Sequence, residues 1–208
     1  MEIPEPHDPD PEPTDAGLLA RVRGGERDAF AALVRRYAAG ARRTAVLLGA
    51  GEEADDVVQE AFVKAYRALG GFREGADFRP WLLRIVANET RNAQRAHRRR
   101  VAREGSPAAV PDGLLPGSGA AVDPAELAVS ADRLAALWLR LHALPDDQRR
   151  VLVCRFLLDL DEAQTATVLG VARGTVKSRT ARGLRRLRAL LDAAAPHGDP
   201  AAEGAGHG

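Results

Sequence analysis

The sequence predicts an all-α protein made of two small helical domains joined by a flexible linker, the second domain containing a helix-turn-helix. Three observations lead to this prediction. Strong helix formers, chiefly Ala, Leu and Arg, dominate the 208 residues, and the 4% aromatic content suits helical cores better than a large sheet. Apolar residues recur at three- and four-residue steps through residues 15–100 and 125–192. Residues 101–124 contain Gly, Pro, Ser and Ala without a period, as flexible linkers do.

Charge is segregated along the chain, although the formal net charge is only +1. Acidic residues and prolines fill residues 1–14, which can bury very little and are expected to form a disordered tail. A second tail, rich in Ala, Pro, Gly and His, is expected in residues 193–208. Cations concentrate in residues 84–103 and 173–188. Clusters of this kind indicate a nucleic-acid partner.

Several classes of protein are excluded by what the sequence lacks. Cys154 is the single cysteine, so neither an internal disulfide nor a zinc site made of thiolates can form. Its apolar neighbours predict a buried structural thiol. The histidines show no metal-ligand spacing, and we expect neither a metal nor a cofactor. The chain has no apolar run of about twenty residues and no signal peptide, which predicts a cytoplasmic protein without membrane insertion.

The first domain opens with helical periodicity near Asp15. A turn at residues 24–25 interrupts the pattern, which continues to a break at residues 49–51. The apolar positions that set the period are Leu18, Leu19, Val22, Phe30, Leu33, Val34 and Tyr37. Helices with one such apolar face must pack on other helices.

The next predicted helix, in residues 52–72, carries a polar cluster in its first half. The cluster consists of Asp55, Asp56, Gln59 and Glu60. Carboxylates there favour the positive end of the helix dipole, so a purely electrostatic role is one interpretation. The other is a protein-docking face, because Asp56, Gln59 and Glu60 share one side of the helix.

A glycine-containing loop leads to a helix whose first turn contains Pro80, where a missing amide hydrogen costs nothing. Trp81 is expected to be a core anchor. Asn88, Arg91, Asn92 and Arg95 follow at i, i+3, i+4 and i+7, which places them on one stripe. Amide and guanidinium groups can read base edges and hold phosphates. The alternative is an ordinary polar outer face.

The second domain is expected to begin near residues 123–124 and to carry one helix up to Pro145. Another helix then begins at Asp146 and Asp147. The residues predicted to face the core in these helices are Leu127, Leu134, Leu137, Leu141, Leu144, Val151, Leu152, Cys154, Phe156 and Leu157.

A helix-turn-helix is predicted in residues 158–191. Asp161 and Gln164 have capping-box spacing at the start of its first helix, and Gly170 supplies the left-handed conformation that ends this helix. The second helix begins near Arg173 and has no acidic residue before Ala189. Its apolar series is Val176, Leu184, Leu187 and Leu191, and its cations are Arg173, Lys177, Arg179, Arg182, Arg185, Arg186 and Arg188. Such a motif can place its second helix in the major groove of DNA.

Five stretches carry a resemblance to a known family. They are LLARVRGGERDAFAALVRRY, DDVVQEAFVKAYRAL, FRPWLLRIVANETRN, LPDDQRRVLV and GTVKSRTARGLRRLR. In this order they resemble bacterial sigma factors of the extracytoplasmic-function (ECF) group, which keeps two conserved domains called regions 2 and 4. The resemblance implies a specificity subunit without catalytic residues of its own, because the chemistry of RNA synthesis belongs to the polymerase.

The same resemblance implies partners and site residues. Core RNA polymerase would dock, through its clamp coiled coil, on Asp55, Asp56, Gln59 and Glu60. The minus-10 element of promoter DNA would be bound by Asn88, which matches an asparagine associated with capture of a flipped base, and by Arg91, Asn92 and Arg95. The minus-35 element would be bound by Arg173, Thr175, Lys177, Ser178, Arg179 and Arg182. An anti-sigma factor is a further expected partner, because family members are commonly held inactive by one.

Three positions depart from the family pattern. Thr165 and Thr180 replace apolar residues that normally face the core, so their hydroxyls need partners, either each other or backbone carbonyls. Our hypothesis is that the two side chains approach one another. Gly183 stands where alanine is common and lowers the intrinsic stability of the helix by up to about 1 kcal/mol.

Two other functions fit the sequence less well than a sigma factor does. One is a helix-turn-helix regulator of the response-regulator type that acts without being a polymerase subunit. Residues 15–100 show no phosphoacceptor arrangement and contain a second candidate nucleic-acid face, which favours the sigma factor. An enzyme acting on nucleic acid would need clustered carboxylates for metals or a phosphate-binding glycine loop, and the sequence has neither pattern.

Overall fold

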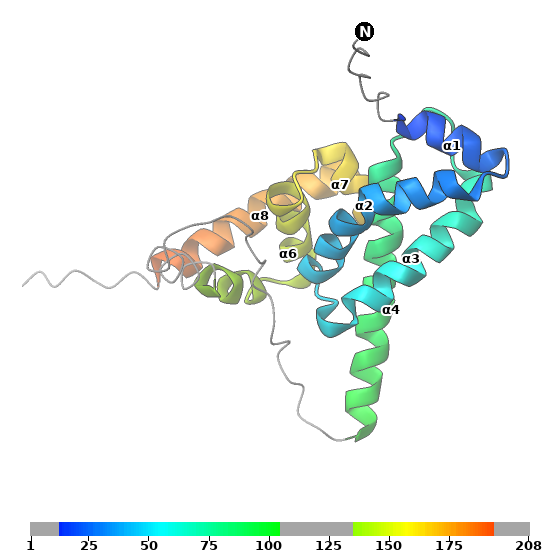
Figure 1. Ribbon diagram of the computed structural model, residues 1–208. Coiled ribbons are helices and arrows are strands. Elements are labelled where there is room, and N and C mark those ends of the chain that lie inside the picture. Colours follow the sequence, from blue (N-terminus) through cyan, green and yellow to red (C-terminus); the bar gives the residue numbers. More distant parts are fainter. Residues whose placement is uncertain (1–12, 105–134, 194–208) are drawn as a thin grey trace, which may run out of the picture. The chain divides into compact units, whose positions relative to one another are not determined.

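Figure 1 shows the computed structural model, which describes residues 13–104 and 135–193. Every regular element in these two ranges is helical, which confirms the all-α prediction. The chain divides into two compact units, which we describe separately. Most of both predicted tails, the linker sequence beyond residue 104, and Leu127 and Leu134 lie outside the described residues. None of the described helices is both long and apolar enough to span a bilayer.

The described part of the first unit, residues 13–104, contains four α-helices, with short 3-10 turns after the second and the third. The helices are α1 (Asp15–Arg23), α2 (Arg27–Leu47), α3 (Ala54–Ala68) and α4 (Phe78–Glu104). Gly25, at φ 94°, makes the predicted turn between α1 and α2, a conformation that glycine adopts without steric cost. α4 ends at Glu104, whereas the linker was predicted to begin at residue 101. The helix and its polar face are therefore longer than the sequence pattern indicated.

The core of the first unit is built from the predicted apolar stripes and one aromatic cluster. Leu33 of α2 and Leu82 of α4 are fully buried, and the two helices pack against one another. Phe72, Phe78 and Trp81 meet at the start of α4 with ring centroids 4.9 to 5.9 Å apart and tilted or edge-to-face planes. Trp81 is therefore a core anchor, as predicted, and the cluster fixes where α4 begins.

The second unit contains a helix at residues 135–142, then α6 (Asp146–Leu152), α7 (Glu162–Leu169) and α8 (Arg173–Asp192). α6 runs directly into a π-helical segment, Val153–Leu157. The predicted capping box is confirmed, because Asp161 accepts from the Gln164 amide at 2.8 Å and the Gln164 side chain accepts from the Asp161 amide at 3.1 Å. Gly170 ends α7 in the left-handed conformation at φ 67°, also as predicted.

Three residues predicted to face the core of the second unit are exposed instead. Phe156 is 57% exposed, because the backbone widens from an α- to a π-helix at Val153 and the side chains that follow change phase. Leu184 and Leu191 are 44% and 43% exposed, because the inward column of α8 runs through Val176 and Gly183. The prediction that these three side chains face the core was therefore wrong.

Gly183 has a packing role that helix propensity alone does not reveal. A β-carbon placed there would lie 3.2 Å from two side-chain atoms of Leu152 and 3.5 Å from Cβ of Gln148. The missing side chain thus lets α8 lie close against α6.

The hydroxyls of Thr165 and Thr180 are satisfied by the backbone and not by each other. Thr165 donates to the carbonyl of Leu160 at 3.5 Å, and Thr180 donates to the carbonyl of Val176 at 2.9 Å. Each hydroxyl has one proton, so these bonds leave none for a mutual hydrogen bond. Of the two kinds of partner considered for these hydroxyls, backbone carbonyls are the ones found.

Cys154 is fully buried, as predicted, and burial raises the pKa of its thiol from 9.0 to about 12. We expect iodoacetamide to leave Cys154 unmodified at pH 8 in the folded protein and to modify it quickly in denaturant, since the thiolate is the nucleophile. Because the thiol ionises only in the unfolded chain between about pH 9 and 12, its contribution to stability is complete below that window and falls as the pH rises through it. Rapid labelling of the folded protein would contradict this.

Candidate polymerase and DNA interfaces

The acidic face predicted on α3 is exposed, but its four residues differ in their internal contacts. Asp55 is 2.8 Å from Arg42 of α2. Glu60 is 3.4 Å from Lys64, which lies closer, at 2.6 Å, to Glu89 of α4. Asp56 and Gln59 have no side-chain hydrogen bond or ion pair with any residue that the structure describes. These two side chains are the ones most available to a partner.

An apolar groove of about 410 Å³ adjoins this face between α2 and α3. Val63 and Tyr66, 36% and 45% exposed, are large apolar side chains left open to solvent there. The residues that line the groove are Phe30, Gln59, Phe62, Val63, Tyr66 and Arg67. Gln59 belongs both to the groove and to the polar face, so the two are continuous. Sequence reasoning missed Val63 and Tyr66, although apolar residues at i and i+3 outside the predicted core stripe were a usable signal.

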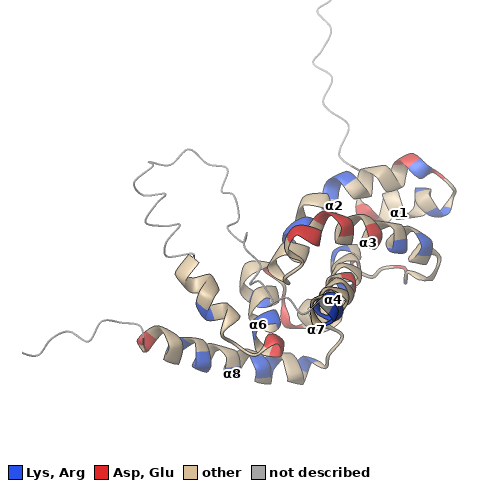
Figure 2. Ribbon diagram, turned by 90° about the horizontal axis from the view of Figure 1, so that it is seen from below, with Lys and Arg blue, Asp and Glu red and all other residues tan. Residues whose placement is uncertain are grey.

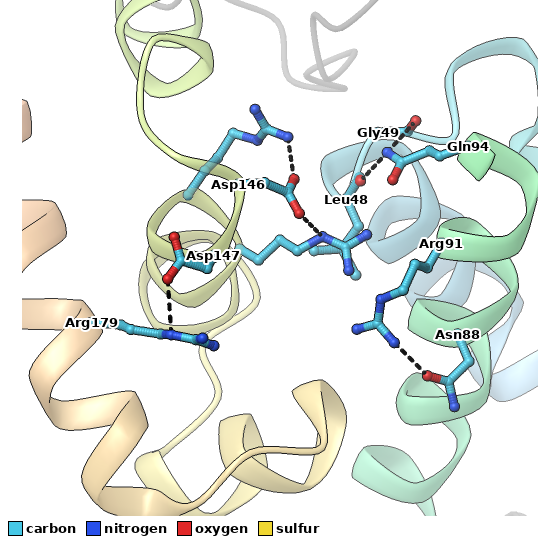
Figure 3. A network of polar contacts seen from close by, with 10 residues as sticks. Leu48, Gly49, Asn88, Arg91, Gln94, Asp146, Asp147 and Arg179 are labelled. Atoms are coloured by element: carbon cyan, nitrogen blue, oxygen red, sulfur yellow. Dashed lines mark hydrogen bonds and ion pairs between the residues drawn. The ribbon is translucent and has the colours of Figure 1, made fainter. Parts of the chain in front are cut away.

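The stripe predicted on α4 is brought together as expected. Asn88, Asn92 and Arg95 are exposed and Arg91 is half-buried, while the opposite face of the helix is packed in the core. Arg91 donates to the side-chain oxygen of Asn88 at 3.2 Å (Figure 3). This hydrogen bond holds the Asn88 amide, the group suited to reading a base edge, in a fixed orientation.

A second contact fixes α4 against the end of α2 next to this stripe. Gln94 donates to the carbonyls of Leu48 and Gly49, both at 2.9 Å (Figure 3). Gly49 has φ 93°, and a β-carbon there would lie 2.5 Å from the Gln94 amide nitrogen. Only glycine leaves room for this contact, which holds α4, and with it the polar stripe, against the end of α2.

Six residues of α8 are predicted to bind DNA, and one of them, Arg179, differs from the other five in having an ion pair with another helix of its unit. Figure 2 shows cations along the length of α8. Arg173, Lys177, Ser178 and Arg182 are exposed and Thr175 is partly exposed, whereas Val176 and Gly183 of the same helix are buried. Arg179, the sixth, is also partly exposed. The five residues therefore belong to the surface that α8 offers to an outside ligand.

Arg179 has a partner inside the protein. Its Nε is 3.1 Å from a carboxylate oxygen of Asp147 on α6, with the two side chains 27% and 45% exposed (Figure 3). The adjacent Asp146 pairs instead with Arg149 at 2.5 Å and Arg150 at 3.3 Å on its own helix. Of these two neighbouring carboxylates, Asp147 is the one that ties α6 to α8.

Both units match models of known families. Residues 29–100 match the family described as Sigma-70 region 2, and residues 134–187 match Sigma-70, region 4. The chain is 36% identical over 181 residues to the ECF RNA polymerase sigma factor SigM of Mycobacterium tuberculosis, with 86% of each chain covered. It is 34% identical over 170 residues to the ECF RNA polymerase sigma-E factor of Escherichia coli K12, with 80% of this chain and 88% of that one covered.

Two solved structures are similar in fold. CnrH, solved in complex with the cytosolic domain of CnrY, has a TM-score of 0.62 at 29% identity, over 86% of this chain and 98% of that one. RpoE of Bartonella quintana, solved in complex with the anti-sigma factor NepR, has a TM-score of 0.63 at 25% identity, over 78% of this chain and 96% of that one.

Proposed function

Because this chain belongs to the ECF group of RNA polymerase sigma factors, with a sigma-70 region 2 and a sigma-70 region 4, we propose that three of its surfaces bind core polymerase, the minus-10 element and the minus-35 element. A sigma factor is a non-enzymatic polymerase subunit, so the work of this chain is recognition. A helix-turn-helix regulator that acts apart from the polymerase would not need the region 2 match over residues 29–100.

Core polymerase docks on the α3 face in this proposal. Asp56 and Gln59 provide polar groups that have no partner among the described residues, and Glu60 adds a second carboxylate on the same side. Val63 and Tyr66 provide the apolar part beside them, consistent with interfaces in which a desolvated centre is bordered by polar groups. Asp55 contributes mainly through Arg42, by holding α3 on α2.

The minus-10 element is bound by α4. Asn88 captures a flipped base, and its hydrogen bond to Arg91 orients the amide before DNA arrives. Capture costs a few kcal/mol of unstacking, which hydrogen bonds to the base edge and stacking must offset. Asn92 and Arg95 follow the strand on the same stripe.

The minus-35 element is bound by the helix-turn-helix of region 4. The observation that carries this assignment is the two-sided character of α8, which buries Val176 and Gly183 and exposes Arg173, Lys177, Ser178 and Arg182. Arg179 acts here as a positioning residue. Its ion pair with Asp147 sets how α8 lies on α6, and hence how the exposed face meets the groove.

Reconstitution with core polymerase tests the function as a whole. The full-length chain should co-purify with core enzyme and direct transcription from start sites whose upstream regions share two elements. It should also compete with other sigma factors for core. A chain that binds DNA but does not compete would support the free-standing regulator instead.

Replacing Lys177 with alanine should weaken binding of the holoenzyme to a minus-35 probe several-fold and lower the salt dependence of binding by about one ion, as loss of one phosphate contact does. If Lys177 reads a base edge instead, the loss is roughly 1 to 3 kcal/mol and depends on the base at one position. Titrations at several salt concentrations measure both quantities. Unchanged affinity and salt slope would remove Lys177 from the interface.

Region 2 or region 4 also binds an anti-sigma factor in this proposal, and the protein acts in the cytoplasm with the polymerase. A similar fold is found in RpoE of Bartonella quintana bound to the anti-sigma factor NepR. The test is whether a protein that co-purifies with the tagged chain prevents its assembly with core enzyme.

A further inference from the structure

Lys64 is a cation at the edge of the acidic face that α3 offers to core polymerase. It follows Glu60 by four residues, so the two side chains are neighbours on the helix surface. A glutamate and a lysine in this order and at this spacing form a favourable pair on an isolated helix. In such a pair Lys64 would neutralise Glu60, one of the carboxylates proposed to bind the polymerase.

The structure shows Lys64 drawn to a different carboxylate. Its Nζ donates to a side-chain oxygen of Glu89 on α4 at 2.6 Å, whereas Glu60 lies 3.4 Å away. The hydrogen bond to Glu89 is also the largest cause of the raised pKa of Lys64. The Glu89 side chain is 13% exposed and that of Glu60 is 52% exposed, so the pair with Glu89 is the less screened of the two. Lys64 is therefore held mainly by α4.

Glu89 depends on α3 for its counter-ion. α3 and α4 pack against one another, and the Glu89 carboxylate lies largely shielded from solvent between a docking helix and a DNA-binding helix. A shielded carboxylate needs a charged or hydrogen-bonding partner. The positions of α4 one turn away from Glu89 hold no cation, and they are Ile85, Val86, Asn92 and Ala93. Lys64 supplies from the neighbouring helix the charge that α4 lacks at this point.

We propose that Glu89 is a positioning residue for core binding, because by holding Lys64 against α4 it keeps Glu60 available to cationic groups of the polymerase. This inference deepens the proposed docking function of α3 and rests on it. Without the Glu89 carboxylate, Lys64 pairs with Glu60, the acidic residue one turn before it on α3. Docking must then break this pair and place a lysine beside cations of the partner, and like charges brought together at an interface disfavour association.

The test measures the affinity of the full-length chain for core polymerase without DNA, so that the position of Glu89 next to Asn88 does not enter. Glu89→Gln should raise the Kd about two- to fivefold, as expected for a partly exposed ion pair. Lys64→Met should bind core at least as tightly as wild type. The double variant Lys64→Met, Glu89→Gln should regain the wild-type Kd or a lower one, because no lysine remains to neutralise Glu60. A mere clamp between α3 and α4 predicts that both single variants weaken binding alike and that the double variant recovers nothing.

Glu26→Gln is the matched control, because it also removes one carboxylate from an ion pair of the same unit, with Arg21 at 2.9 Å, but outside α3 and α4. It should leave the Kd unchanged, and circular dichroism should show that every variant keeps its helical content. An unchanged Kd for Glu89→Gln, or a double variant as weak as Glu89→Gln, would overturn the proposal.

Glu60→Gln separates the two levels of inference. If it weakens core binding while Glu89→Gln does not, only the role of Glu89 is wrong and the docking face stands. If neither variant changes the Kd, Glu60 does not belong to the docking face, and the proposed function fails at this residue as well.

Discussion

Replacing Asp56 and Glu60 together with lysine is expected to abolish transcription by this sigma factor while leaving its fold intact. Both side chains are exposed on α3, and neither contributes to the core of region 2. Lys64, which is 3.4 Å from Glu60, keeps its closer partner Glu89. Each reversal removes a favourable charge from the proposed interface and introduces a repulsive one, a change that costs about 2 kcal/mol or more at a desolvated charge pair. The affinity for core polymerase should therefore fall by on the order of 1000-fold.

Co-purification with core enzyme and promoter-directed transcription measure this effect. The matched control reverses Glu26 and Glu74, two exposed acidic residues of the same unit that lie outside α3. It changes the net charge by the same amount and should leave assembly unaffected. If the α3 variant still co-purified with core, the docking assignment would be wrong. If the control lost assembly equally, net charge and not the α3 face would be responsible.

The parts of this fold that the sequence predicted are those whose causes are local. The capping box at Asp161 needs only two side chains three residues apart, and the turn at Gly170 needs only a residue that tolerates positive φ. The α4 stripe from Asn88 to Arg95 depends on helical spacing alone. Each of these features is determined within one or two turns of the chain, and so it is readable without knowing what packs against it.

The parts that the sequence could not predict depend on contacts between helices. The phase of α8 is set by how closely it approaches Leu152, and this approach requires Gly183, which looked like a weak point in the helix. The same phase leaves Leu184 exposed. Apolar spacing defines a broad stripe, and packing selects which of its columns faces inward.

The groove beside α3 was missed for a similar reason. Tyr66 lies on a helix whose inward face was already accounted for by other apolar residues, so an additional aromatic residue looked incidental. Its ring centroid is 4.9 Å from that of Phe30, which comes from α2. A hollow formed by two helices becomes visible only once they are placed side by side.

Reversing the Asp147–Arg179 ion pair is expected to distinguish a positioning role from direct DNA contact. Arg179→Asp should weaken minus-35 binding by about 2 to 3 kcal/mol, because it places two carboxylates across the contact between α6 and α8 and adds a negative charge near the DNA phosphates. Asp147→Arg should have a smaller effect, since the half-exposed pair itself contributes no more than about 1 kcal/mol. The double variant restores an opposite-charge pair between the same two helices. If Arg179 acts by positioning α8, the double variant should recover the part of the binding free energy that the two facing carboxylates cost, while the part lost to the added negative charge near DNA stays lost.

The exchange is informative because the two roles predict opposite results. In the double variant the cation lies on α6 and the carboxylate on α8, so a direct contact between residue 179 and DNA stays lost whatever the geometry of the helices. Binding that remains as weak as in Arg179→Asp would make Arg179 a DNA-contacting residue, as the family resemblance alone implied. Glu162→Arg is the control, because Glu162 lies on α7 and makes no ion pair with any residue that the structure describes. This substitution should neither mimic Asp147→Arg nor rescue Arg179→Asp, since rescue requires a cation at the α6 position that pairs with Arg179.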